Sequence, residues 1–131
     1  MPSIFTRIIN REIPGEIIAE DDKFIAILDI MPLVHGHTLV IPKQETDYIF
    51  DLEGETLSAM MLFAKRVARA VRKAVPCQRI GVSVIGLEVP HTHVHLVPIN
   101  SADDLNFTRP KLKPSPAELA EMADRIRAAL D

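Results

Sequence analysis

Short apolar runs separated by turn residues fill the first third of the chain. Residues 4–10 predict a short helix that ends at the turn Ile13-Pro14-Gly15. Residues 17–20 and 24–29 predict two strands, and the Asp21-Asp22 turn between them favours a hairpin. Residues 38–42 predict a third short strand.

Residues 52–75 have a longer hydrophobic period. Apolar residues recur there at three- and four-residue steps, as on one face of an α-helix. We expect this face to comprise Leu57, Met61, Ala64, Ala68, Val71 and Val75. The rest of the helix surface is basic. Because no aromatic residues are interleaved with these charges, we interpret them as a solvated face with favourable charge near the helix C-terminus.

Residues 79–85 and 92–98 are rich in Val and Ile and predict two further strands. A last helix begins at Ser115, because Ser115 can cap it, Pro116 suits its first turn and Glu118 can close a capping box. Its buried stripe would be Leu119, Met122, Ile126 and Leu130. Without regular βαβ alternation, this order predicts an α+β fold, with an antiparallel sheet and helices on one side.

Length and composition restrict the class of protein. A chain of 131 residues, 47% of them hydrophobic, fits a single soluble domain over residues 1–131. A net charge of −3 argues against a nucleic-acid partner, since gripping duplex DNA requires a basic face. The single cysteine, Cys77, excludes an intrachain disulfide and suits a reducing compartment. With neither a secretory signal nor a membrane-spanning apolar run, we expect a cytoplasmic protein without a membrane partner.

The histidines carry the chemical signal. His91, His93 and His95 alternate with Thr and Val, so on a strand they would share one face. Three imidazoles in register are hard to explain by packing, because each brings polar nitrogens that need partners when buried. The two other histidines, His35 and His37, lie together just before the third predicted strand. We expect His37 to join the cluster and His35 to be an exposed loop residue.

Two chemistries can use such a cluster. The outer two of three alternate strand residues would lie about 13 Å apart, too far to share one zinc ion without leaning sharply inward. The alternative is nucleophilic attack on phosphorus, in which the central imidazole forms a covalent intermediate and its neighbours donate hydrogen bonds to the phosphate. We favour this second chemistry, and we expect neither a metal nor a cofactor.

The sequence resembles the histidine-triad (HIT) family, whose signature is His-x-His-x-His followed by apolar residues. The resemblance extends from the N-terminal pattern (Ile4-Phe5, Ile8-Ile9, Glu12-Ile13-Pro14) through Gly36-His37-Thr38-Leu39-Val40-Ile41-Pro42 to the triad. It covers roughly residues 4–98. Residues 99–131 fit the variable C-terminal region of the family and add little to the resemblance.

This resemblance implies a five-stranded antiparallel sheet with one long and one C-terminal helix, a homodimer, and a purine nucleotide substrate. By motif position His93 would be the nucleophile, His95 would contact the phosphate and help the leaving group, and His91 and His37 would order the site. Asp29 would hold the ribose hydroxyls, since a carboxylate accepts from both. The resemblance assigns the walls of the base pocket to Phe5, Ile8, Ile27 and Ile30.

The segment before the triad departs from the family pattern. Many relatives carry Gln where Leu87 stands and Ser or Thr where Glu88 stands, and a carboxylate would repel a phosphate. The nucleotide-binding Asn of the phosphoramidase branch has no clear counterpart, and Ser83 is a candidate substitute. We therefore predict a nucleoside phosphoramidase or a dinucleoside polyphosphate hydrolase. A nucleotide-binding sensor with little turnover and a histidine-rich metal protein remain the alternatives.

Overall fold

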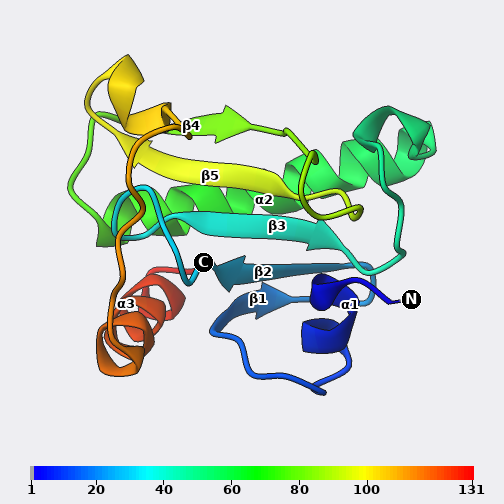
Figure 1. Cartoon of the computed structure of the whole chain (residues 1–131), viewed down its shortest axis with the longest axis horizontal. Coiled ribbons are helices and arrows are strands. Elements are labelled where there is room, and N and C mark those ends of the chain that lie inside the picture. Colours follow the sequence, from blue (N-terminus) through cyan, green and yellow to red (C-terminus); the bar gives the residue numbers. More distant parts are fainter. Residues whose placement is uncertain (1) are drawn as a thin grey trace.

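The computed structural model describes residues 2–131 and contains a five-stranded antiparallel sheet of order β1-β2-β3-β5-β4 (Figure 1). Its strands are β1 (Ile17–Glu20), β2 (Phe24–Leu28), β3 (Thr38–Pro42), β4 (Arg79–Ser83) and β5 (Val94–Ile99). Its helices are α1 (Ile4–Ile9), α2 (Gly54–Ala74) and α3 (Pro116–Ala128), with two 3-10 turns, η1 (Ile49–Asp51) and η2 (Ala102–Leu105). The predicted α+β fold is confirmed.

The hairpin between β1 and β2 follows from its aspartates. One carboxylate oxygen of Asp21 accepts the backbone N–H groups of Lys23 (2.8 Å) and Phe24 (2.8 Å), which fixes the turn. The second strand ends at Leu28, one residue earlier than expected, although the Asp29 N–H still donates to the carbonyl of His37 at 3.0 Å. Asp29 thus leaves the sheet beside the start of β3.

The two long helices, α2 and α3, pack in one core on the same face of the sheet, as expected, and the short helix α1 covers the other face. Figure 1 shows α2 behind the sheet and α1 in front of it. All five residues of β2 are buried, because alternate residues pack in opposite directions. Ala26 and Leu28 join the core under α2 and α3, whereas Ile25 and Ile27 pack with Phe5 of α1.

The buried face of α2 is rotated from the predicted one. Met61, on the predicted apolar face, is 42% exposed, whereas Met60, just beside that face, is fully buried. Apolar residues lie at both positions, and only the contact with the sheet selects between two adjacent faces. The residues that this contact buries are Met60, Phe63, Ala64, Val67, Ala70 and Val71.

The C-terminal helix has the predicted start. The Ser115 side chain accepts from the Glu118 N–H at 3.1 Å, and the Glu118 carboxylate accepts from the Ser115 N–H at 2.9 Å. Ile126 is fully buried in the core under the sheet, with Leu119, Met122 and Leu130 packed around it. Among the helices of residues 2–131, none has the length and hydropathy needed to cross a bilayer.

Candidate active site

The three triad histidines line up on the α1 face of the sheet. Strand β5 begins at Val94, two residues later than predicted, so His91 and His93 lie in the extended segment that leads into it. Their rings still form a row with Phe5 inserted into it. The centroid distances are 5.8 Å for His91–Phe5, 4.9 Å for Phe5–His93 and 4.9 Å for His93–His95.

His91 ties the N-terminus to the sheet. Its ring is fully buried, and burial lowers its pKa. A carbonyl can only accept, so the 2.7 Å contact with the Pro42 carbonyl places the proton on Nε2. Nδ1 then accepts from the Ser3 hydroxyl at 2.6 Å. Both ring nitrogens are occupied, and His91 is left without a lone pair for chemistry.

His93 is held in the opposite tautomer. Its Nδ1 lies 2.7 Å from the His91 carbonyl and must carry the proton. Within residues 2–131 its Nε2 has no hydrogen-bond partner, yet this atom is not among buried unsatisfied groups, so it reaches the surface. The ring as a whole is 8% exposed. His93 therefore presents a free lone pair at the opening of the site.

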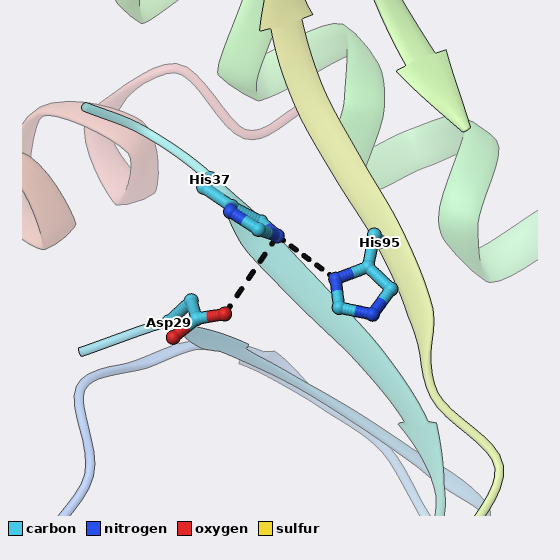
Figure 2. Close-up of side chains that lie close together, drawn as sticks. All are labelled: Asp29, His37 and His95. Atoms are coloured by element: carbon cyan, nitrogen blue, oxygen red, sulfur yellow. Dashed lines mark hydrogen bonds and ion pairs between the residues drawn. The ribbon is translucent and has the colours of Figure 1, made fainter. Parts of the chain in front are cut away.

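His37 and His95 form a relay of fixed tautomers (Figure 2). The Leu33 N–H donates to His37 Nδ1 at 3.0 Å, so the proton of His37 is on Nε2. That proton is donated to His95 Nδ1 at 2.9 Å, which leaves the His95 proton on Nε2. His95 thus presents an N–H donor beside the lone pair of His93. Gly36, at φ +94°, allows the sharp turn that delivers His37 to this position.

Burial keeps the relay uncharged at neutral pH. It lowers the pKa of His37 to about 3, with the neighbouring His95 adding to the effect. It lowers the pKa of His95 to about 4, with His93 as the second cause. A neutral imidazole donates one hydrogen bond and accepts one, as the relay requires of both rings. His35, by contrast, is exposed, as expected.

Asp29 lies at the edge of this cluster, with its side chain 22% exposed. Its Oδ1 accepts from the Met31 N–H at 2.9 Å, and its Oδ2 is 3.7 Å from His37 Nε2, too far for a hydrogen bond. Burial raises the pKa of its carboxyl group. The second oxygen is therefore available to an incoming hydroxyl group.

Asp29, His37 and His95 also bring three potential metal-ligand atoms within 4.8 Å of one another. The tautomers disfavour a metal at this position. Since the Leu33 N–H occupies Nδ1 of His37, its Nε2 carries the proton and has no lone pair to offer. A divalent ion there would require the loss of that proton, which a neutral imidazole gives up only with difficulty.

An apolar cavity of about 210 Å³ opens beside Asp29, between α1 and β2. The four residues predicted to line a base pocket all line it, and Ile30 is the most exposed of them at 63%. The complete lining is Ile4, Phe5, Ile8, Ile13, Pro14, Gly15, Ile27, Leu28, Asp29, Ile30 and Leu39.

A second cavity, of about 200 Å³, lies against His93 and His95. The segment before the triad borders this cavity. Its Leu87 is 89% exposed, and because the leucine side chain is apolar it offers the site no hydrogen-bonding group. The remaining lining residues are Ile85, Gly86, Glu88, Phe107 and Lys111. Ser83, the predicted substitute for the family's Asn, is the β4 partner of His95 and shares its face of the sheet.

The C-terminal segment, residues 99–131, contributes an aromatic side chain to the site. The Phe107 ring packs edge-on against His95 (4.7 Å between centroids) and His37 (6.2 Å). Figure 1 shows the chain after η2 descending past the sheet toward α3. Neither Phe107 nor Lys111 has a periodic or motif signal in the sequence that would have identified it.

The fold and this row of tautomerically fixed imidazoles define a histidine-triad protein. The chain belongs to the HIT family, because the family model of the HIT domain matches residues 10–102. A HIT-like protein of Bartonella henselae, described as involved in cell-cycle regulation, is 35% identical in sequence, with a TM-score of 0.84 over 98% of this chain and 96% of its own.

Two further relatives bear on chemistry. Adenosine 5′-monophosphoramidase HNT1 of Saccharomyces cerevisiae is 38% identical over 72% of this chain and 61% of its own length. A zinc-bound histidine-triad protein of Mycobacterium smegmatis is 33% identical, with a TM-score of 0.81 over 96% of this chain and 91% of its own. The family thus includes hydrolases of nucleotide conjugates.

Proposed function

We propose that this protein is a nucleotide hydrolase that cleaves purine nucleotide conjugates at the α-phosphorus, through a nucleotidyl intermediate on His93. One observation carries the proposal. Of the four clustered histidines, only His93 has a lone pair without a hydrogen-bond partner among residues 2–131. That lone pair opens beside the N–H donor of His95, the arrangement that attack on a phosphate ester or amide requires.

The proposed reaction consists of two successive displacements at phosphorus. The Nε2 lone pair of His93 attacks phosphorus, and the bond to the leaving group breaks with its electron pair on the leaving atom. The ring becomes cationic, and its Nδ1–H donates more strongly to the His91 carbonyl, 2.7 Å away. An amine leaving group takes one proton from water. A second water then attacks phosphorus, and the bond from phosphorus to His93 breaks with its electron pair returning to Nε2. The hydroxide left by the first water takes the proton of the second, and the mononucleotide is released.

The other predicted residues have fitting positions for binding. His95 Nε2–H would donate to a phosphate oxygen, and Asp29 would accept from the ribose hydroxyls. The apolar cavity beside Asp29 would take the base between Phe5, Ile8, Ile27 and Ile30. His91 and His37 would act through other groups: His91 through its carbonyl, and His37 through the tautomer of His95.

The decisive experiment uses adenosine 5′-phosphoramidate and a dinucleoside polyphosphate, each with and without a chelator, with intact-mass detection of an adenylyl adduct. We expect release of AMP in both conditions and an adduct on His93. His93→Ala should abolish turnover and retain AMP binding. Full activity in that variant would refute the nucleophile assignment.

A binding module with little turnover is the second candidate, favoured by the exposed Leu87 at the position where many relatives place Gln. Measurable AMP affinity without product or adduct from either substrate would select it.

We also propose that the protein acts as a homodimer. Strand β4 is an edge of the sheet, and Val82 on it is 51% exposed. Exposed apolar side chains that follow β4 in sequence line one hollow with others near η1, and unpaired edge strands and exposed apolar surface of this kind favour pairing. They include Tyr48, Phe50, Val84, Ile85 and Leu87. Sedimentation velocity should give a dimer, and Val82→Asp should shift it to monomer.

A further inference from the structure

The second cavity contains a cation that the proposed mechanism has not used. Lys111 and the two reactive histidines line it together, and this cavity shares no residue with the apolar cavity proposed for the base. If the base lies in one cavity and phosphorus lies at His93, the leaving group has to enter the other. The side chains in the second cavity therefore select the leaving group.

Lys111 is held in place by its own loop. Its ammonium donates to the carbonyls of Phe107 at 2.5 Å and Arg109 at 3.3 Å. An ammonium has three N–H groups, so one remains for a ligand. The ammonium also lies 5.8 Å from the centroid of the Phe107 ring, whose edge packs against His95. The same short loop thus fixes the position of the cation relative to the triad.

The charge of Lys111 is not neutralised by the protein. None of the ion pairs within residues 2–131 includes it. The side chain is half-buried, so its field is less screened than that of a fully exposed lysine. Its charge reaches the site: after burial, the dominant cause, Lys111 is among the groups that lower the pKa of His37.

We infer that Lys111 is the leaving-group determinant of this enzyme and selects conjugates whose leaving group is a compact oxyanion, such as sulfate or phosphate. The inference rests on the proposed function. When a P–O bond to such a group breaks, the electron pair stays on the departing oxygen as added negative charge, and the ammonium stabilises this charge without proton transfer. A departing amine becomes neutral by taking a proton and gains nothing from a cation.

Glu88 lines the same cavity and opposes this selection. Its side chain is exposed, so water screens it more than the half-buried ammonium, and we expect the effect of Lys111 to dominate. The pair provides matched variants in one cavity: Lys111→Gln removes the positive charge, and Glu88→Gln removes the negative one.

The test compares two substrates that differ only in the leaving group, adenosine 5′-phosphosulfate and adenosine 5′-phosphoramidate. Lys111→Gln should lower kcat/KM for the phosphosulfate about 10- to 100-fold, the range of a charged hydrogen bond, and change the phosphoramidate by less than about threefold. Lys111→Arg should restore most of the loss, and Glu88→Gln should raise the phosphosulfate rate. An equal loss for both substrates, or no loss for either, would overturn the inference.

A binding measurement separates failure of this inference from failure of the proposed function. In the His93→Ala background, ADP should bind more tightly than AMP, and Lys111→Gln should remove that preference while leaving AMP affinity unchanged. If wild-type protein cleaves neither substrate, the hydrolase proposal fails, and this comparison alone decides the role of Lys111. Equal affinities for ADP and AMP before the substitution would then overturn it.

Discussion

His37 Nε2 donates to His95 Nδ1 across 2.9 Å, and this single bond fixes which nitrogen of His95 faces the opening of the site. The Leu33 N–H sets the direction of the relay by donating to the other nitrogen of His37. A backbone amide cannot change its role with protonation, whereas a side chain can. The tautomer of His95 is therefore determined by the main chain, through one intervening ring.

The relay predicts that His37 is a positioning residue. His37→Met removes the donor, so His95 can change tautomer and lose its outward N–H, and kcat should fall about 10- to 100-fold with little change in KM. His37→Gln retains an amide N–H of similar reach and should recover most of the activity. Steady-state kinetics of both variants test this, and equal losses would mean that His37 contributes only packing.

From the position of Asp29 we expect the enzyme to prefer conjugates that contain ribose. Its Oδ2 is not hydrogen-bonded within residues 2–131, and a carboxylate can accept from both hydroxyls of a diol. Asp29→Asn should lower kcat/KM for an adenosine conjugate about 10-fold or more, and should leave the rate for the 2′,3′-dideoxy analogue nearly unchanged. A variant that loses the same factor on both substrates would show that Asp29 does not contact the sugar.

The features of the fold and the site that the sequence predicts are those that depend on residues close together in the chain. Three strands and the Ser115 cap depend on neighbours within a few residues, and they lie where periodicity and turn chemistry placed them. The convergence of His37 with the triad followed from two short motifs on adjacent strands.

The features that the sequence does not predict are those determined by contacts between residues far apart in the chain. The sequence does not distinguish whether Met60 or Met61 faces the sheet. Nor does it select a face for α1, which the contacts of Phe5 with His91 and His93 determine. Phe107 and Lys111 lie in an irregular segment, whose path depends on packing against the finished domain. The hydrogen bond between Ser3 and His91 joins residues 88 positions apart and has no signature in the sequence.

The cluster of Asp29, His37 and His95 predicts weak metal binding despite its ligand types. Because His37 Nε2 carries a proton, zinc would have to compete with the relay. Protein purified without added metal should contain well under one equivalent of zinc by plasma mass spectrometry, and activity should be unaffected by a chelator. Stoichiometric zinc that His37→Gln removes would contradict the tautomer assignment.

Ser3 connects the start of α1 to the histidine cluster, and we expect its loss to destabilise the protein. Its hydroxyl donates to His91 Nδ1 at 2.6 Å and accepts from the Thr6 N–H at 3.1 Å at the start of α1. Ser3→Ala should lower the free energy of unfolding by about 1–3 kcal/mol, from loss of the cap and of a buried hydrogen bond. Urea denaturation measures this, and Ser3→Thr, which retains the hydroxyl, should remain close to wild type. A fully stable Ser3→Ala would show that the bond contributes nothing net.

The buried histidines predict that the protein loses stability in mild acid. His37 and His95 have pKa values of about 3 and about 4 in the folded state, against 6.5 as the ordinary value. Below that ordinary value the unfolded chain binds protons that the folded chain refuses, so the free energy of unfolding falls as pH falls. Each ring contributes a slope of up to about 1.4 kcal/mol per pH unit. Urea denaturation between about pH 6.5 and 5 isolates this effect, because ordinary carboxyl groups titrate mostly below that window. His37→Gln should reduce the slope, and a variant that keeps the full wild-type slope would show that His37 is not a source of the acid sensitivity.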